Sequence, residues 1–244
     1  MSSRLPVKPI KSRTNGRSGF QWMLPLVPIL GGALLMQVPT DAFASTVTFN
    51  FGALISGPRS PAGSLPWMQA TFVDNGSGGG VTLTLMAYGL TGSENISAVD
   101  FNIDPVLEPK LRRLRFAYAG GTGTAARPSA SKNRFKVPGD GSYDIRFVFP
   151  KMGGFNAGDS VSYRITGITG LTAASFNFPS LCRTGCGTGS NYAAAQVQNI
   201  AGSTTTSAWI GSKVGVVPIP AAGWLFGWGF LGLIGIARRR RHAL

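Results

Sequence analysis

Two pairs of aspartates have the residue type and spacing that could carry out acid–base chemistry. Asp100 and Asp104 are separated by three residues, and the same spacing separates Asp140 from Asp144. A glycosidase needs two carboxyl groups roughly 5 to 9.5 Å apart across a sugar-binding cleft. Aspartates beside Gly and Ser also form turns by accepting backbone hydrogen bonds. The pairs therefore indicate either a carboxylate-dependent polysaccharide-active enzyme or a set of turns.

Calcium binding is an alternative use of Asp140 and Asp144, because loop carboxylates and carbonyl oxygens are the usual ligands of this ion. The chain contains no EF-hand or RTX pattern. These two residues are thus weak candidates for the site of a calcium-dependent adhesin. We expect no cofactor and no other metal.

Histidine and cysteine limit the remaining chemistry. The single histidine, His242, follows a run of arginines, so we expect no Ser/His/Asp site, no Cys/His site and no His-ligated metal in the folded part. Cys182 and Cys186 are the only cysteines, and they predict a small disulfide loop in an oxidising compartment. A redox pair and a reactive free thiol are the alternatives. We therefore expect no enzymatic activity.

Basic residues form two clusters in the middle of the chain. The first contains Lys110, Arg112, Arg113 and Arg115, and the second contains Arg127, Lys132, Arg134 and Lys136. On strands, alternate members of each cluster would face water. One interpretation is a solvated face. The functional interpretation is attraction to an anionic polymer such as acidic exopolysaccharide, which salt would weaken.

Period-two alternation of apolar and polar residues predicts the strands that must position these groups. It is clearest in Val81–Leu85, Ile145–Phe149, Val161–Ile165 and Phe176–Phe178. Further candidates are Val47–Phe51, Met68–Val73, Val99–Ile103, Leu114–Tyr118, Asn133–Val137 and Ala193–Gln198. Gly-rich turns separate these segments. We expect an all-β fold, a single antiparallel β-sandwich or jelly-roll-like domain over residues 45–216.

Residues 1–44 have the pattern of a secretory signal peptide. Basic residues precede an apolar stretch from Phe20 to Met36, and Ala42 and Ala44 supply the small residues that signal peptidase reads. We predict cleavage before Ser45. An uncleaved N-terminal anchor is the alternative, but two prolines within the apolar stretch argue against a durable membrane helix.

Residues 217–244 have the physical properties of a membrane anchor. The uncharged segment Ala221–Ala237 would rise roughly 26 Å as a helix, close to the ~30 Å hydrocarbon thickness of a bilayer. Four arginines follow it: Arg238, Arg239, Arg240 and Arg241. They should stay cytoplasmic, which places the preceding domain outside the cytoplasm. Pro218 and Pro220 keep the segment before the helix extended and accessible to a protease.

The motif Val217, Pro218, Ile219 and Pro220, with the apolar segment and the arginines, resembles the C-terminal sorting signal of PEP-CTERM proteins in a Val-Pro-x-Pro variant. In that family an exosortase, a membrane-embedded cysteine transpeptidase, recognises the signal, and the helix is removed near the Pro motif. The resemblance implies that the chain is anchored in the membrane only transiently. The alternative is a plain C-terminal anchor that is never cut.

Segments of the middle region also resemble the exported domains of a group of PEP-CTERM proteins. They are Val99–Pro105, Gly139–Phe147, Leu171–Phe178 and Ala208–Gly211. The resemblance implies a surface or matrix protein of unassigned activity. Its processing partners would be signal peptidase and an exosortase-type transpeptidase.

Removal of both ends changes the charge of the protein. The whole chain has a formal net charge of +14, whereas 14 basic and 8 acidic residues between Ser45 and Val217 leave a charge near +6. This ordinary value removes most of the support for nucleic-acid binding. The sequence therefore predicts an exported, non-enzymatic protein of the cell surface or extracellular matrix with a structural or binding role.

Overall fold

The computed structural model describes residues 44–216 except 77–78, 152–153, 183–185, 187–189, 203 and 214. The predicted sorting signal 217–244 and residues 1–43 of the predicted signal peptide lie outside the described residues, so both segments stay predictions. Among the residues described, no helix is long and apolar enough to cross a bilayer.

The first sheet contains six antiparallel strands. In spatial order they are β13 (Gly215–Val216), β1 (Thr46–Phe51), β3 (Met68–Asp74), β4 (Val81–Met86), β10 (Ser160–Thr166) and β6 (Arg115–Gly121). Strand β4 shows why they form, because its buried Val and Leu residues alternate with half-buried Thr residues. One face of the strand therefore packs in the core while the other meets water.

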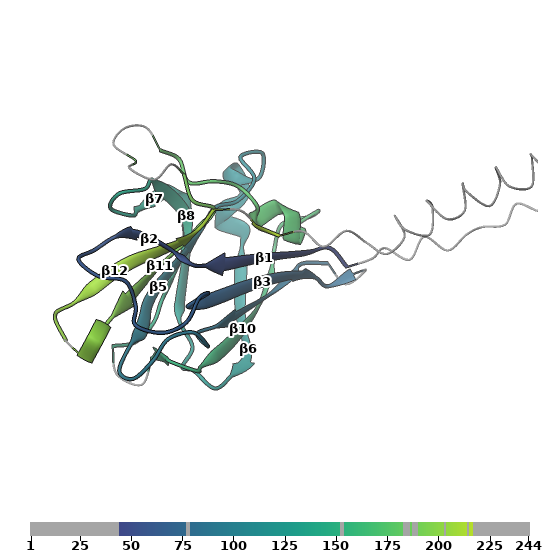
Figure 1. Ribbon diagram of the computed structural model, residues 1–244. Coiled ribbons are helices and arrows are strands. Elements are labelled where there is room, and N and C mark those ends of the chain that lie inside the picture. Colours follow the sequence, from purple (N-terminus) through teal and green to yellow (C-terminus); the bar gives the residue numbers. More distant parts are fainter. Residues whose placement is uncertain are drawn as a thin grey trace, which may run out of the picture. The chain divides into compact units, whose positions relative to one another are not determined.

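The second sheet contains seven strands, again antiparallel. Six follow the order β2 (Ala53–Ser56), β12 (Ser207–Ser212), β11 (Ala193–Gln198), β5 (Asn95–Phe101), β8 (Ser142–Val148) and β7 (Arg127–Lys136), and β9 (Phe155–Asn156) pairs with β5. Figure 1 shows β2, β12, β11, β5 and β8 next to one another, apart from the layer that contains β1 and β3.

Aromatic residues from both sheets meet in one core. The ring of Phe72 on β3 lies 5.0 Å from that of Phe101 on β5, and Phe147 on β8 lies 5.0 Å from Tyr163 on β10. All four side chains are almost fully buried, so the two sheets are held together mainly by the removal of apolar surface from water. The prediction of a mostly β, antiparallel fold with almost no helix is confirmed.

Short 3-10 helices join some of the strands, among them η2 (Glu108–Arg113), η3 (Ala173–Phe176) and η4 (Ile200–Gly202). The strand predicted at Phe176–Phe178 is wrong, because Phe176 ends η3, whose first turn is closed by a capping box between Thr172 and Ser175. Three residues of alternation are too few to distinguish a strand from a capped turn. Likewise Lys110, Arg112 and Arg113 lie on η2 and not on a strand, since Pro109 favours the start of a helix.

Strands β5 and β8 bring distant parts of the sequence to one edge of the second sheet. Phe101, the last residue of β5, pairs with Ile145 near the start of β8. The chain after β5 then turns into η2, whose first residue is Glu108. Residues 102–108 and the beginning of β8 therefore meet at this edge.

Candidate functional site

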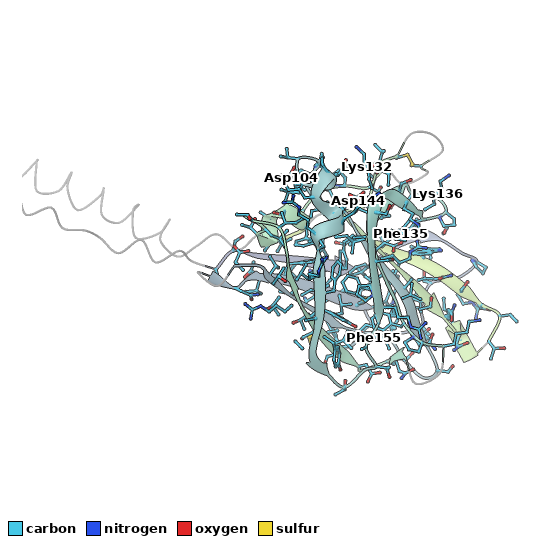
Figure 2. All side chains as sticks on the ribbon, turned by 180° about the vertical axis from the view of Figure 1, so that it is seen from behind. Asp104, Lys132, Phe135, Lys136, Asp144 and Phe155 are labelled. Atoms are coloured by element: carbon cyan, nitrogen blue, oxygen red, sulfur yellow. A yellow bond between two sulfur atoms is a disulfide. The ribbon has the colours of Figure 1, made fainter. Side chains whose placement is uncertain are left out.

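A cavity of about 260 Å³ opens at the edge where β5 ends and β8 begins. It is lined by Asn102, Ile103, Pro105, Glu108, Asn133, Asp144, Phe178, Pro179, Ser180 and Leu181. Four separate segments of the chain thus contribute to its wall. In Figure 2, Asp104, Asp144 and Lys132 lie toward this end of the molecule, and Phe155 lies toward the other end.

Asp144 is the buried carboxylate of the cavity. Its side chain accepts one backbone hydrogen bond at each oxygen, from the N–H of Asn133 at 2.7 Å and from the N–H of Ile103 at 3.3 Å. Burial raises the pKa of Asp144 above its ordinary value, and these two N–H donors oppose the rise. Asn133 adopts a left-handed conformation (φ 50°), which Asn tolerates better than most residues.

Glu108 is the second carboxylate of the cavity. Its Oε2 forms an ion pair with Nζ of Lys132 at 2.6 Å, and the Glu108 side chain is only 11% exposed, against 66% for that of Lys132. The pair connects η2 to β7. The negative charge of Glu108 adds to the rise in the pKa of Asp144, although burial remains the larger cause.

Asn102 adds a polar group that the surrounding protein leaves unmatched. The residue is 3% exposed, and its Nδ2 has no hydrogen-bond partner among the described residues. Buried polar groups in folded proteins are hydrogen-bonded in the large majority of cases. This donor is therefore a buried, unmatched polar atom of a residue that lines the cavity, and it has almost no accessible surface of its own.

The other three candidate aspartates are not among the residues that line this cavity. Oδ1 of Asp104 accepts a hydrogen bond from the N–H of Val106 at 2.8 Å, which closes a turn. Asp100 forms a two-fold contact with Arg146, at 2.7 Å to Nε and 2.6 Å to Nη2. Burial raises the pKa of Asp100 to about 6, and Arg146 opposes this rise.

Asp140 organises a buried turn beneath the disulfide. Its carboxylate accepts hydrogen bonds from the hydroxyl of Tyr143 at 2.5 Å, the hydroxyl of Ser180 at 2.8 Å and the N–H of Asn191 at 3.1 Å. Cys182 and Cys186 form the predicted disulfide, with Cα atoms 6.3 Å apart. The sulfur of Cys186 contacts the carbonyl oxygen of Asp140. The carboxylate of Asp140 thus contacts Ser180 and Asn191, which lie before and after the two cysteines in the chain.

Of the candidate site residues predicted from the sequence, only Asp144 lines the cavity, and its neighbours Glu108 and Asn102 are not among those predicted. Glu108 and Asn102 carry no spacing signal, because each becomes significant only once β5 and β8 are paired. Among the described residues there is no group of three or more His, Cys, Asp or Glu side chains that could hold a metal ion. Asp140 and Asp144 contact separate sets of donors.

The first basic cluster lies on the same helix as Glu108. Lys110, Arg112 and Arg113 are exposed on η2, while Leu111 is buried beneath them. Arg115 begins β6, and its Nη1 donates to the carbonyl oxygens at the end of η2, including that of Arg112 at 3.1 Å. Within the described part of the chain, the recorded ion pairs involve Lys132 and Arg146 and none of these four residues.

The second basic cluster lies along the edge strand β7. Lys132, Arg134 and Lys136 are exposed, and the alternating residue Phe135 is buried. In Figure 2, Lys136 and Phe135 lie toward the right of the molecule and Asp104 lies at the upper left. The alternation expected of a strand is therefore present here.

Comparison with known proteins finds no match to the chain among protein-family models, curated proteins or solved structures.

Proposed function

We propose that this chain is an exported, non-enzymatic protein of the cell surface or extracellular matrix, whose domain over residues 45–216 binds acidic polysaccharide. One observation supports the binding role most directly: the exposed cations of η2 and β6 have no carboxylate partner among the described residues. The two packed antiparallel sheets suit a β-sandwich of the jelly-roll-like kind. The signal peptide, the exosortase-processed C-terminus and the final surface location rest on the sequence patterns.

The basic cluster of η2, defined as Lys110, Arg112, Arg113 and Arg115, exposes its four side chains to solvent. Buried Leu111 and Leu114 fix the helix to the core, so its cations project from a supported surface. Guanidinium groups bind carboxylates through two parallel hydrogen bonds, which suits the uronic acids of acidic polysaccharides. Such contacts between exposed charges weaken as salt screens them.

Binding of alginate by the purified full chain in mild detergent tests the proposal, with dextran as the uncharged control polymer. We expect alginate to bind at low ionic strength and to dissociate as sodium chloride is added, and dextran not to bind. The variant Lys110→Ser/Arg112→Ser/Arg113→Ser should lose most of the binding. Arg115 is kept, since it caps η2.

A control variant of equal net charge separates a local surface from general attraction. Arg59→Ser/Lys151→Ser/Arg164→Ser removes three exposed cations that lie outside η2, β6 and β7. It should retain alginate binding. Equal loss in both variants, or binding that does not respond to salt, would contradict the proposal.

A carboxylate-dependent polysaccharide-active enzyme is the second candidate, and one observation favours it. Asp144, with its raised pKa, lines the same cavity as Glu108, and glycosidases pair a protonated acid with an ionised carboxylate. Against it, both oxygens of Asp144 accept backbone hydrogen bonds, and Glu108 pairs with Lys132. Release of reducing ends from alginate or dextran by the wild type, absent in Asp144→Asn, would favour the enzyme.

A further inference from the structure

The backbone nitrogen of Ser45 lies beside a carboxylate at the point where the first strand begins. Its N–H donates to Oδ2 of Asp74 at 3.2 Å, and its carbonyl oxygen accepts the N–H of Asp74 at 3.0 Å. These two bonds extend the pairing of β1 with β3 beyond Thr46 and Val73. The nitrogen of Ser45 therefore meets a carboxylate where a regular antiparallel pair would supply a backbone carbonyl oxygen.

The carboxylate of Asp74 is held in place by a second contact. The residue is half-buried, and its Oδ1 accepts the N–H of Ala173, the first residue of η3, at 2.5 Å. Both donors to this carboxylate are neutral backbone amides. Neither of the two ion pairs recorded among the described residues includes Asp74. Within this part of the chain, Asp74 is thus a fixed carboxylate with no recorded cationic partner.

Cleavage before Ser45 would change the chemistry of its nitrogen. Ala44, on the other side of the predicted cut, is exposed. Hydrolysis breaks the C–N bond between the two residues, leaves a carboxylate on Ala44 and releases an amine on Ser45. An α-amino group has a pKa of about 7.7–8.0, so it binds a proton at neutral pH. A neutral amide donor would thereby become an ammonium group 3.2 Å from Oδ2 of Asp74.

We propose that Asp74 is the binding site for the α-ammonium group of the mature N-terminus, so that removal of the signal peptide adds an ion pair between Ser45 and Asp74. The proposal rests on the cleavage that is part of the proposed function. A hydrogen bond between an ammonium group and a carboxylate is stronger than one from a neutral amide. Because Ala173 already holds the carboxylate, cleavage strengthens the attachment of β1 to β3 and η3 without a rearrangement.

The test is the melting temperature of the protein after processing in a bacterial host that has signal peptidase but no exosortase, purified in mild detergent. Mass spectrometry first establishes whether the N-terminus is Ser45. Periodate then cleaves the Cα–Cβ bond of an N-terminal serine, removes its nitrogen and leaves an aldehyde, while internal serines do not react. We expect oxidation to lower the melting temperature by about 1–3 °C, the size expected of one partly exposed ion pair in a domain of this length.

Two variants connect this shift to the carboxylate. Asp74→Asn keeps the shape of the side chain and removes its charge, so oxidation should leave its melting temperature unchanged. Asp159→Asn is the matched control, because Asp159 is also half-buried and also accepts a backbone N–H, from Asn156 at 2.8 Å. It should respond to oxidation as the wild type does.

The outcomes separate the ion pair from the predicted cleavage. A wild type that begins at Ser45 and melts at the same temperature before and after oxidation would refute the ion pair alone, and this measurement decides even if Asp74→Asn does not fold. An equal shift in the wild type and in Asp74→Asn would also refute it. A different N-terminal residue would refute the predicted cleavage, and the ion pair with it.

Discussion

At the scale of single residues, Arg146 and Asp100 determine how the outer face of the second sheet is held together. The guanidinium group of Arg146 lies 5.1 Å from the ring centre of Phe135 and 5.4 Å from that of Trp209. It also neutralises Asp100, whose side chain is 0% exposed. The arginine thus joins strands β7, β12 and β5 through one side chain.

Arg146→Met should destabilise the protein by about 3–5 kcal/mol, because it leaves a buried carboxylate without its partner. Asp100→Asn/Arg146→Met should be less destabilised than Arg146→Met, since no unpaired charge remains. Chemical denaturation measures the free energy of unfolding of both variants.

The control is Lys132→Met, which breaks an ion pair whose lysine is 66% exposed, so it should lower the free energy of unfolding by less than about 1 kcal/mol. A similar cost for Arg146→Met and Lys132→Met would contradict this account of the buried pair.

The pKa of Asp100 predicts a pH dependence of stability. Because burial raises this pKa to about 6, the folded state binds the proton more tightly than the unfolded state. The contribution is fully present below the ordinary value of 3.8 and is lost as the pH rises through about 6. The melting temperature should therefore rise as the pH is lowered from about 7 to about 5.

Two features make this pH effect measurable. The only histidine of the chain is His242, which lies outside residues 45–216, so no histidine of the domain titrates in the same range. The pKa of Asp144 is raised as well, and its contribution has the same sign. Asp100→Asn should flatten the dependence without abolishing it. An unchanged slope in that variant would mean that Asp100 does not titrate in this range.

At the scale of elements, sequence alternation predicts strands well only where no bulge interrupts them. The segments Val81–Leu85 and Val161–Ile165 correspond within one residue at each end to β4 and β10. Strand β7 begins six residues before the predicted Asn133–Val137, and its pairing with β8 shifts between Ala130 and Phe135. Such a shift interrupts the alternation of apolar and polar residues, so the first half of β7 does not have the sequence pattern of a strand.

The cavity is harder to predict than the strands, because it depends on pairing between distant segments. Asp144 is suggested by its loop context, but its neighbours Asn133 and Ile103 reach it only through the register of β7, β8 and β5. Glu108 looks like an ordinary residue before a proline. No local sequence pattern indicates that Glu108 lies close to Asp144 in the fold.

A glycine after β10 sets the position of η2 and gives the prediction at this scale. Gly167 has φ 101°, and a Cβ there would lie 1.9 Å from the carbonyl oxygen of Arg113, at the end of η2. Gly167→Ala must therefore move the helix or strain the turn. We expect a loss of about 2–3 kcal/mol in the free energy of unfolding, with weaker alginate binding because the basic cluster shifts.

Gly170→Ala is the matched control for that variant. Gly170 also has a positive φ, 79°, but no atom lies within 4 Å of the place a Cβ would take. Its substitution should cost only the backbone term, about 1 kcal/mol, and leave alginate binding unchanged. Equal losses in the two variants would show that contact with Arg113 has no part in holding η2.

At the scale of the whole molecule, the two ends of the described domain lie on neighbouring strands. Thr48 on β1 pairs with Val216 on β13. The two ends of the described part of the chain therefore lie at the same edge of the first sheet. Removal of both segments would leave in place the residues of the cavity and of the basic cluster.

The proposed sorting predicts the covalent state of the mature protein in its native host. Because signal peptidase and an exosortase-type transpeptidase would cut the chain, mass spectrometry should find neither residues 1–44 nor the segment Arg238–Leu244. Pro218→Ala/Pro220→Ala should retain that C-terminal segment and stay in the membrane fraction, since alanine allows the helix to extend through the motif. Pro58→Ala, at an exposed proline inside the domain, should be processed normally. An intact Arg238–Leu244 segment on the wild-type protein would show instead that residues 217–244 are a permanent anchor, and the basic cluster would then act at the membrane surface rather than in the matrix.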